Sequence, residues 1–104
     1  QMGTLVADAM LARVADQGVE IAIMNGGGLR AGIDEGAITM GEVLTVLPFQ
    51  NTLSTFRISG QTVIDALEHG VSNMTMGDGR FPQVAGVTFS IALSAARGVR
   101  IRVV

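Results

Sequence analysis

The stretch Val19–Arg30, VEIAIMNGGGLR, organises the chain, because a short apolar run leads directly into a glycine-rich loop. The run Val19–Met24 has the length and composition of a buried strand, so we expect residues 25–32 to form the loop that follows it. Glycine tolerates positive φ angles and lets a backbone approach a ligand closely. The pattern therefore predicts a strand that opens into a loop with the potential to bind a ligand.

Three helices are predicted around this strand. Residues 3–17 carry apolar side chains at helical spacing and are followed by Gly18, which is a common helix stop. The sequence TMGE at Thr39–Glu42 matches a capping box and predicts a short helix to about Val46, before Pro48. A third helix is expected from Gly60 to about Asn73, with Ser59 as its N-cap and a core stripe of Val63, Ile64, Leu67 and Val71.

The remaining segments predict strands and loops. Alternation over Thr52–Ile58 indicates a strand, and the composition of residues 74–83 indicates a loop. Two further strands are expected at Val87–Leu93 and Val99–Val104, joined by a turn at residues 95–98. This order of elements predicts an α+β or mixed α/β fold. Since the chain ends on an apolar strand, we expect a truncated domain that self-associates through an exposed strand edge.

Composition excludes several classes of function. The 104 residues suit one domain, and no apolar run approaches the roughly 20 residues of a membrane-spanning helix. A net charge of −2 offers no basic surface for a nucleic-acid polymer. With no cysteine, one histidine and nine scattered acids, the sequence predicts no metal site. All seven basic residues are arginine, so any cationic contact with phosphate must come from arginine.

The glycine loop supplies the first candidate binding residues, namely Asn25, Gly27, Gly28 and Arg30. An arginine at the end of such a loop can bind phosphate oxygens in bidentate fashion. The Asn25 amide can both donate and accept a hydrogen bond, as recognition of a base or sugar requires. The alternative is a structural turn, because the spacing matches neither a dinucleotide fingerprint nor a P-loop.

The segment VLPFQN supplies two more candidates, Phe49 and Asn51. Pro48 restricts the backbone before Phe49, and an aromatic ring at a loop tip can stack on a base. The alternative is that Phe49 belongs to the core. His69 is expected on the surface or near the end of the third helix, and no Ser-His-Asp set or other nucleophile motif occurs. Asp78–Pro82 is interpreted as a turn whose Arg and Phe could line a cleft.

The motifs NGGGLR, GAIT, VLPFQN, SGQTVIDALEHG and FPQVAGVTF occur in an order and spacing that resembles the C-terminal domain of the 5'-nucleotidase family. That family also contains UDP-sugar hydrolases and cyclic-nucleotide phosphodiesterases. The resemblance covers nearly the whole chain, and QMGTLVADAM is similar to the family's first helix. It implies an α+β domain with a bifurcated sheet between helical layers. The family's last strands and last helix would lie outside residues 1–104.

The resemblance also implies a division of labour between two domains. An N-terminal domain, expected upstream, carries two divalent metal ions and a catalytic His-Asp pair. The C-terminal domain binds the nucleoside part of the substrate and rotates to deliver its phosphate to the metals. The parent would then be a metal-dependent, periplasmic or extracellular hydrolase of nucleoside monophosphates, and this chain alone would be inactive. The alternatives are a non-catalytic nucleotide-binding or interaction module, or a parent that acts on cyclic nucleotides or UDP-sugars.

Residue by residue, the resemblance assigns Arg30 to phosphate or ribose and Asn25 to base or sugar. Phe49 would be one of two aromatics that sandwich the base, with Asn51 at the edge of the base. Gly79 matches a backbone position near the base. Two family features are missing from the sequence: an arginine before the first helix, and a later segment with the second stacking phenylalanine and a GGDG-type turn. The implied pocket is therefore incomplete.

Overall fold

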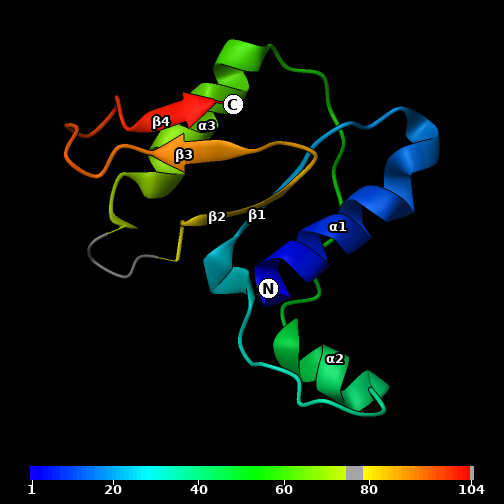
Figure 1. Cartoon of the computed structure of the whole chain (residues 1–104). Helices are drawn as coiled ribbons and strands as arrows, with labels where there is room; N and C mark the ends of the chain where they lie inside the picture. Colours follow the sequence, from blue (N-terminus) through cyan, green and yellow to red (C-terminus); the bar gives the residue numbers. More distant parts are fainter. Residues whose placement is uncertain (75–78, 104) are drawn as a thin grey trace.

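The computed structural model describes residues 1–74 and 79–103, whose helices and strands are drawn in Figure 1. Within these residues, three α-helices and four short strands carry the fold, and two short 3₁₀ turns follow α1 and β1 directly. In chain order the elements are α1 (Met2–Val14), a 3₁₀ turn (Ala15–Gln17), β1 (Ala22–Asn25), a second 3₁₀ turn (Gly26–Gly28), α2 (Met40–Val46), α3 (Gly60–Val71), β2 (Pro82–Ala85), β3 (Phe89–Ile91) and β4 (Ile101–Val103).

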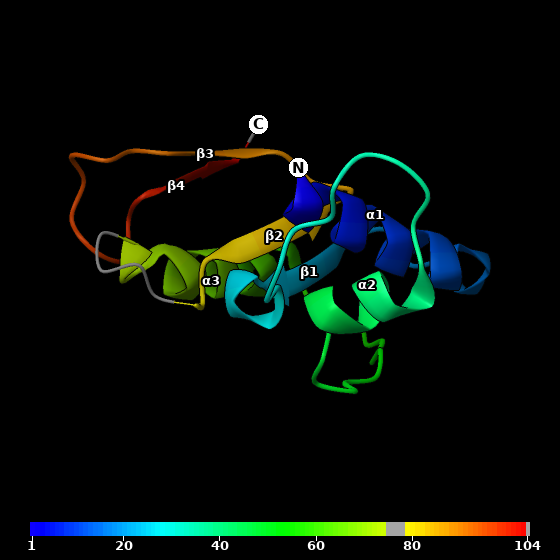
Figure 2. The same ribbon diagram turned by 90° about the horizontal axis from the view of Figure 1, so that it is seen from below.

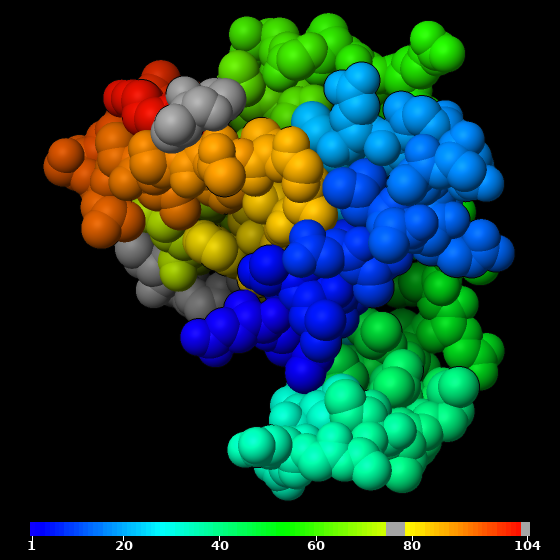
Figure 3. Space-filling view, turned by 45° about the vertical axis from the view of Figure 1, so that its right-hand side comes forward, coloured from blue at the N-terminus to red at the C-terminus, as the bar shows by residue number. Residues whose placement is uncertain are grey.

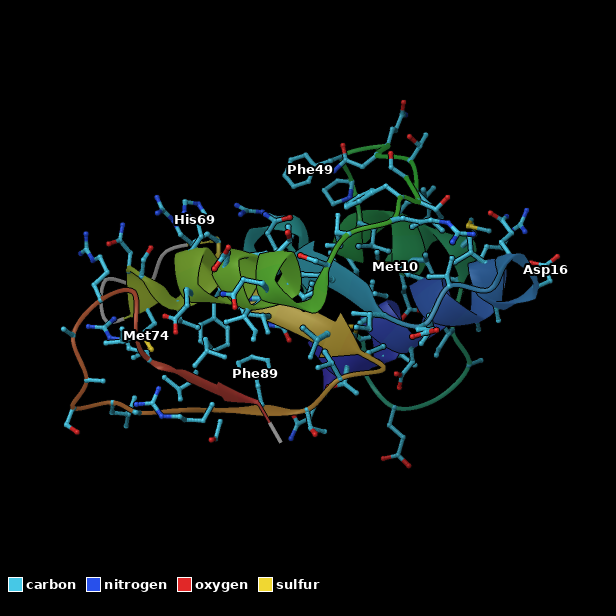
Figure 4. All side chains as sticks on the ribbon, turned by 90° about the horizontal axis from the view of Figure 1, so that it is seen from above. Met10, Asp16, Phe49, His69, Met74 and Phe89 are labelled. Carbon is cyan, nitrogen blue, oxygen red and sulfur yellow. The ribbon has the colours of Figure 1, made fainter. Side chains whose placement is uncertain are left out.

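The strands form two antiparallel pairs, β1 with β2 and β3 with β4. Helix α1 packs on one face of the β1–β2 pair, and α3 contacts both β2 and β4. Figures 1 and 2 show α3 beside both strand pairs, and in Figure 4 the Phe89 ring points from β3 toward α3. The α+β class is confirmed, and the described sheet is split into two pairs that α3 holds together.

Alternation along β1 and β2 explains why two helices can cover opposite faces of one strand pair. Ala22 lies opposite Ala85 in the ladder, and both pack with Ala7 of α1. The next pair, Ile23 and Val84, packs instead with the α3 core. Successive side chains of a strand point to opposite faces. The same β1–β2 register therefore presents alanines to α1 and larger apolar side chains to α3.

The core around α3 is the larger of the two apolar clusters. Leu67 and Val71 are 0% exposed and meet Ile101 of β4. Burying a side chain of this size stabilises a fold by about 1.5–3 kcal/mol. The α1 interface is built from small residues, and at Gly3 the side chain of Gln83 occupies the space that a Cβ would fill. This core positions the carboxyl end of β1.

The helices predicted from local signals are confirmed. Thr39 and Glu42 form both hydrogen bonds of the capping box at α2, and Ser59 accepts a hydrogen bond from the Thr62 amide at the start of α3. The first helix ends as expected, because Gly18 adopts the left-handed conformation with φ 76°. Of the predicted α3 stripe, Leu67 and Val71 are buried, and Val63 and Ile64 are partly buried.

The strand predictions need correction. Thr52–Ile58 is not a strand: residues 51–59 have no regular structure and are exposed, because no described strand lies in register to pair with them. The predicted loop at 74–83 is wrong at its end, since Pro82 and Gln83 belong to β2. A proline is tolerated there because it is the first residue of the strand.

The other strand boundaries are shorter than expected. The first strand begins at Ala22 rather than Val19, and the last two strands are confined to Phe89–Ile91 and Ile101–Val103. The turn between the last two strands is confirmed, with Gly98 at φ 93°. Asp78 and Val104 lie outside the described residues. None of the helices in residues 1–74 and 79–103 is long and apolar enough to cross a membrane.

Candidate functional site

The glycine loop is held against a second segment of backbone. The Gly26 N–H donates to the Phe81 carbonyl at 2.7 Å, and the Gly27 N–H donates to the Gly79 carbonyl at 2.8 Å. A Cβ on Gly27 would lie 3.0 Å from the Gly79 Cα, and a Cβ on Gly79 would lie 3.1 Å from the Gly27 Cα. The two backbones therefore touch, and this contact explains why glycine occupies both positions.

Arg30 connects the glycine loop to α2 and to Phe49. Its backbone N–H donates to the Val46 carbonyl at 2.9 Å, at the end of α2. Its Nη1 lies 3.5 Å from the Gly27 carbonyl, which is a long hydrogen bond. The guanidinium carbon lies 5.9 Å from the centroid of the Phe49 ring, within the range of a cation–π contact. The arginine head is thus held over one face of the ring.

Phe49 lies in the chain reversal that follows α2. Leu47 has φ −122° and ψ 72°, outside the helical region that proline disfavours for the residue before it. Phe49 is 55% exposed, which rules out the alternative that it belongs to the core. Asn51 is exposed two residues later. Figure 4 shows the Phe49 ring on this loop, away from α3 and its core.

A cleft of about 1000 Å³ lies between α1, the end of β1, α2 and the loop after α2. Figure 3 shows the region of α2 standing off from α1, with a hollow between them. The cleft brings together four of the predicted site residues, Asn25, Gly28, Phe49 and Asn51, whereas Gly27, Gly79 and Arg30 do not line it. Its apolar wall consists of Met2, Leu5, Val6, Ala9, Met10, Ile23, Met24, Ile33, Val43, Val46, Leu47, Leu53 and Phe56.

Four polar residues line the cleft without being predicted as binding residues, namely Arg13, Gln50, Thr52 and Ser54. Arg13, in the last turn of α1, lines it together with Met10 and Val6. These positions share one helix face, so helical spacing combined with the absence of lysine could have identified Arg13. Gln50 also lines the cleft, between two predicted binding residues. No sequence pattern marked Gln50.

A second groove, of about 680 Å³, runs beside the unpaired edge of β1. One side is formed by residues 17–23 and the other by residues 53–58, and Val63 of α3 contributes as well. Residues 53–58 pair with no described strand, and β1, which supplies Ala22 and Ile23 to the other side, pairs with β2 alone. Across this groove, residues 53–58, which were predicted as part of a strand, face the unpaired edge of β1.

The side chains around the cleft are chemically suited to binding a flat, partly anionic ligand. An exposed ring, two amides and an arginine can hold a flat base and an anionic group. Among residues 1–74 and 79–103, no three His, Asp or Glu side chains lie close enough together to hold a metal ion. His69 is exposed near the end of α3, as expected, and is not among the residues that line the cleft.

Three comparisons place the chain among known proteins. The family model described as 5'-nucleotidase, C-terminal domain, matches residues 1–104. A trifunctional nucleotide phosphoesterase of Bacillus subtilis is 50% identical over 96% of this chain, and the human 5'-nucleotidase is 37% identical over 96%. The solved structure of a 5'-nucleotidase precursor from Thermus thermophilus matches 96% of the chain with a TM-score of 0.94 and 44% identity.

The matches to these three proteins involve a small part of each. The chain covers 7% of the Bacillus protein, 19% of the human protein and 20% of the Thermus chain. The family model nevertheless spans every residue from Gln1 to Val104, and the fold agrees with the solved relative throughout the matched region. The chain therefore belongs to the 5'-nucleotidase family, as its C-terminal domain.

Proposed function

We propose that this chain is the nucleotide-binding domain of a two-domain, metal-dependent 5'-nucleotidase that hydrolyses nucleoside monophosphates to nucleoside and phosphate. The observation that carries the proposal is the position of Phe49. This ring is 55% exposed, lines the cleft and has Arg30 over one face. An aromatic side chain in such a position presents a flat, apolar surface to a flat ligand.

The base would stack on the free face of the Phe49 ring. Stacking of this kind contributes about 1–3 kcal/mol per base in nucleic-acid complexes. Asn25 and Asn51 line the same cleft, where Asn25 would bind the base or the sugar and Asn51 would bind the edge of the base. Gly28 also lines the cleft and leaves its backbone accessible to the ligand.

Arg30 would bind the phosphate or the ribose. Its guanidinium has five N–H donors in a planar fork that matches phosphate oxygens. Its contact with Gly27 is long, at 3.5 Å, so little is lost when the head turns toward an anion. Gly27 and Gly79 do not line the cleft, and their contact with each other would act indirectly, by giving the glycine loop its shape.

Hydrolysis is assigned to an N-terminal metallophosphoesterase domain. Two divalent metal ions held there would supply the Lewis acid and the activated water. The described residues of this chain do not fit such a centre, since no three potential ligands converge. In this proposal the chain binds the nucleotide and orients its phosphate, and it has no hydrolytic activity of its own. We further propose a periplasmic or extracellular location, which rests on the family alone.

The proposal is tested by titrating the isotopically labelled chain with AMP and following backbone amide signals by NMR. The amides of residues 25–30 and 49–51 are expected to shift with AMP. Ribose 5-phosphate, which lacks the base, should perturb residues 25–30 but leave 49–51 nearly unchanged. If neither compound moves these amides at millimolar concentration, the cleft is not a nucleotide site. A cyclic nucleotide and a UDP-sugar, titrated in parallel, compare the alternative substrate classes.

A further inference from the structure

Gln50 has an unusual backbone conformation for its residue type. Its φ angle is 50°, and it is the one non-glycine residue with positive φ in the described part of the chain. L-residues with a Cβ rarely adopt this left-handed conformation, and β-branched residues adopt it least. The side chain makes no hydrogen bond with the described residues that would compensate for it. The conformation is therefore imposed by the path of the chain.

The path at this point connects two binding residues. Phe49 and Asn51 flank Gln50, and all three line the cleft. Before them, the chain is fixed by Pro48 and by the hydrogen bond from the Arg30 N–H to the Val46 carbonyl. After Asn51, residues 52–59 belong to no helix or strand. Gln50 therefore lies between a part of the chain that Pro48 and the Arg30–Val46 hydrogen bond hold in place and a segment without regular structure.

We propose that Gln50 is a positioning residue for nucleotide recognition, and that it acts through its left-handed backbone rather than through its amide side chain. This inference rests on the proposed function and deepens it. With φ near 50°, the chain turns sharply after Phe49 and brings Asn51 back to the same cleft. With an extended φ, the chain would continue away from α2 and would separate the ring from the amide.

The two possible roles of Gln50 are separated by a pair of substitutions. Gln50→Gly removes the side chain but favours the left-handed conformation, and Gln50→Val removes the amide and strongly disfavours that conformation. A matched control is Gln17→Val, the same chemical change in the 3₁₀ turn after α1, where φ is not positive. Gln17 is exposed and is not among the residues that line the cleft.

The readout is steady-state kinetics of the two-domain parent with AMP and with p-nitrophenyl phosphate, a phosphoester without a base. Gln50→Val should raise KM for AMP about tenfold, because stacking and edge contacts are lost together, and it should leave the kinetics with p-nitrophenyl phosphate unchanged. Gln50→Gly should stay close to the unmodified enzyme with both substrates, as should Gln17→Val. In the isolated chain, a strong intraresidue amide–Hα NOE at position 50 should report positive φ in the unmodified form and should weaken in Gln50→Val.

The remaining outcomes distinguish failure of the backbone role of Gln50 from failure of the proposed function. Equal losses for Gln50→Gly and Gln50→Val would assign the effect to the side chain and overturn the backbone role. AMP kinetics of Gln50→Val that match the unmodified enzyme would overturn the inference alone and leave the proposed function intact. If the unmodified enzyme does not hydrolyse AMP, the proposed function fails, and this inference fails with it.

Discussion

The guanidinium of Arg30 lies over the ring of Phe49, with 5.9 Å between the Arg30 Cζ and the ring centroid. They come from different loops, one after β1 and one after α2, and the Arg30–Val46 backbone hydrogen bond joins the first loop to the end of α2. A cation–π contact at an exposed site contributes about 0.5–1 kcal/mol. The contact leaves one face of the ring available, and in the proposed function it places the group that would bind phosphate beside the ring that would bind the base.

Arg30→Ala in the two-domain parent is expected to lower kcat/KM for AMP by about tenfold or more. Charge-assisted hydrogen bonds contribute about 1.5–3 kcal/mol, and 1.36 kcal/mol corresponds to a factor of ten. Arg30→Lys should recover part of the loss, since a point charge lacks the planar fork. Arg57→Ala, at an exposed arginine outside the cleft lining, is the control and should be neutral. Full activity of Arg30→Ala would leave NGGGLR as a structural turn.

Gly27→Ala is expected to destabilise the isolated chain by about 1–3 kcal/mol, the usual cost of overpacking. The new Cβ would meet the Gly79 Cα at 3.0 Å, and backbone cannot move aside as a flexible side chain can. Gly32→Ala is the matched control in the same loop, because nothing lies within 4 Å of its Cβ position. Thermal unfolding followed by circular dichroism measures both. Equal melting temperatures for the two variants would refute the proposed packing of Gly27 against Gly79.

Three features of the chain show what could be predicted from the sequence and what could not. The α2 cap was predictable because Thr39 and Glu42 are three residues apart and bond to each other's backbone. The Gly27–Gly79 contact joins residues far apart in sequence, and either glycine alone resembles an ordinary turn. The left-handed φ of Gln50 could not be predicted from the sequence, because glutamine is not among the residues that favour this conformation.

The error at Thr52–Ile58 has a different origin. Its alternation satisfies the local pattern of a strand, but a strand forms only when another strand supplies hydrogen-bond partners. In the described chain β1 pairs with β2 alone, and a groove separates β1 from residues 53–58. The segment has the composition of a strand, but whether it pairs depends on a neighbouring strand that the local sequence cannot reveal.

This open edge predicts self-association of the isolated chain. Sedimentation velocity at increasing concentration should show dimers, because an exposed strand edge is a template for pairing with another chain. Thr55→Pro removes a backbone donor from a segment that is unpaired in the single chain, so it should weaken the dimer without unfolding the monomer. A clean monomer at several hundred micromolar would contradict this prediction.

The isolated chain should release no phosphate from AMP, whichever divalent metal is supplied. Its described residues contain no group of three potential ligands, and catalysis by metal ions needs several that converge. A sensitive phosphate assay with Mg²⁺, Mn²⁺, Zn²⁺ and Co²⁺ measures this. Metal-dependent turnover that persists after repurification and disappears in the Arg30→Ala variant would show that the division of labour between domains is wrong.

The central claim, that this chain recognises the base of a nucleotide, is tested most directly by Phe49→Ala in the two-domain parent. KM is measured for AMP and for p-nitrophenyl phosphate, with Leu44→Ala as the control at a residue of α2 that is exposed to a similar degree, 59%. The account predicts a KM for AMP raised about tenfold, an unchanged KM for p-nitrophenyl phosphate and an unchanged melting temperature. Equal losses with both substrates, accompanied by a lower melting temperature, would contradict it and make Phe49 a structural residue.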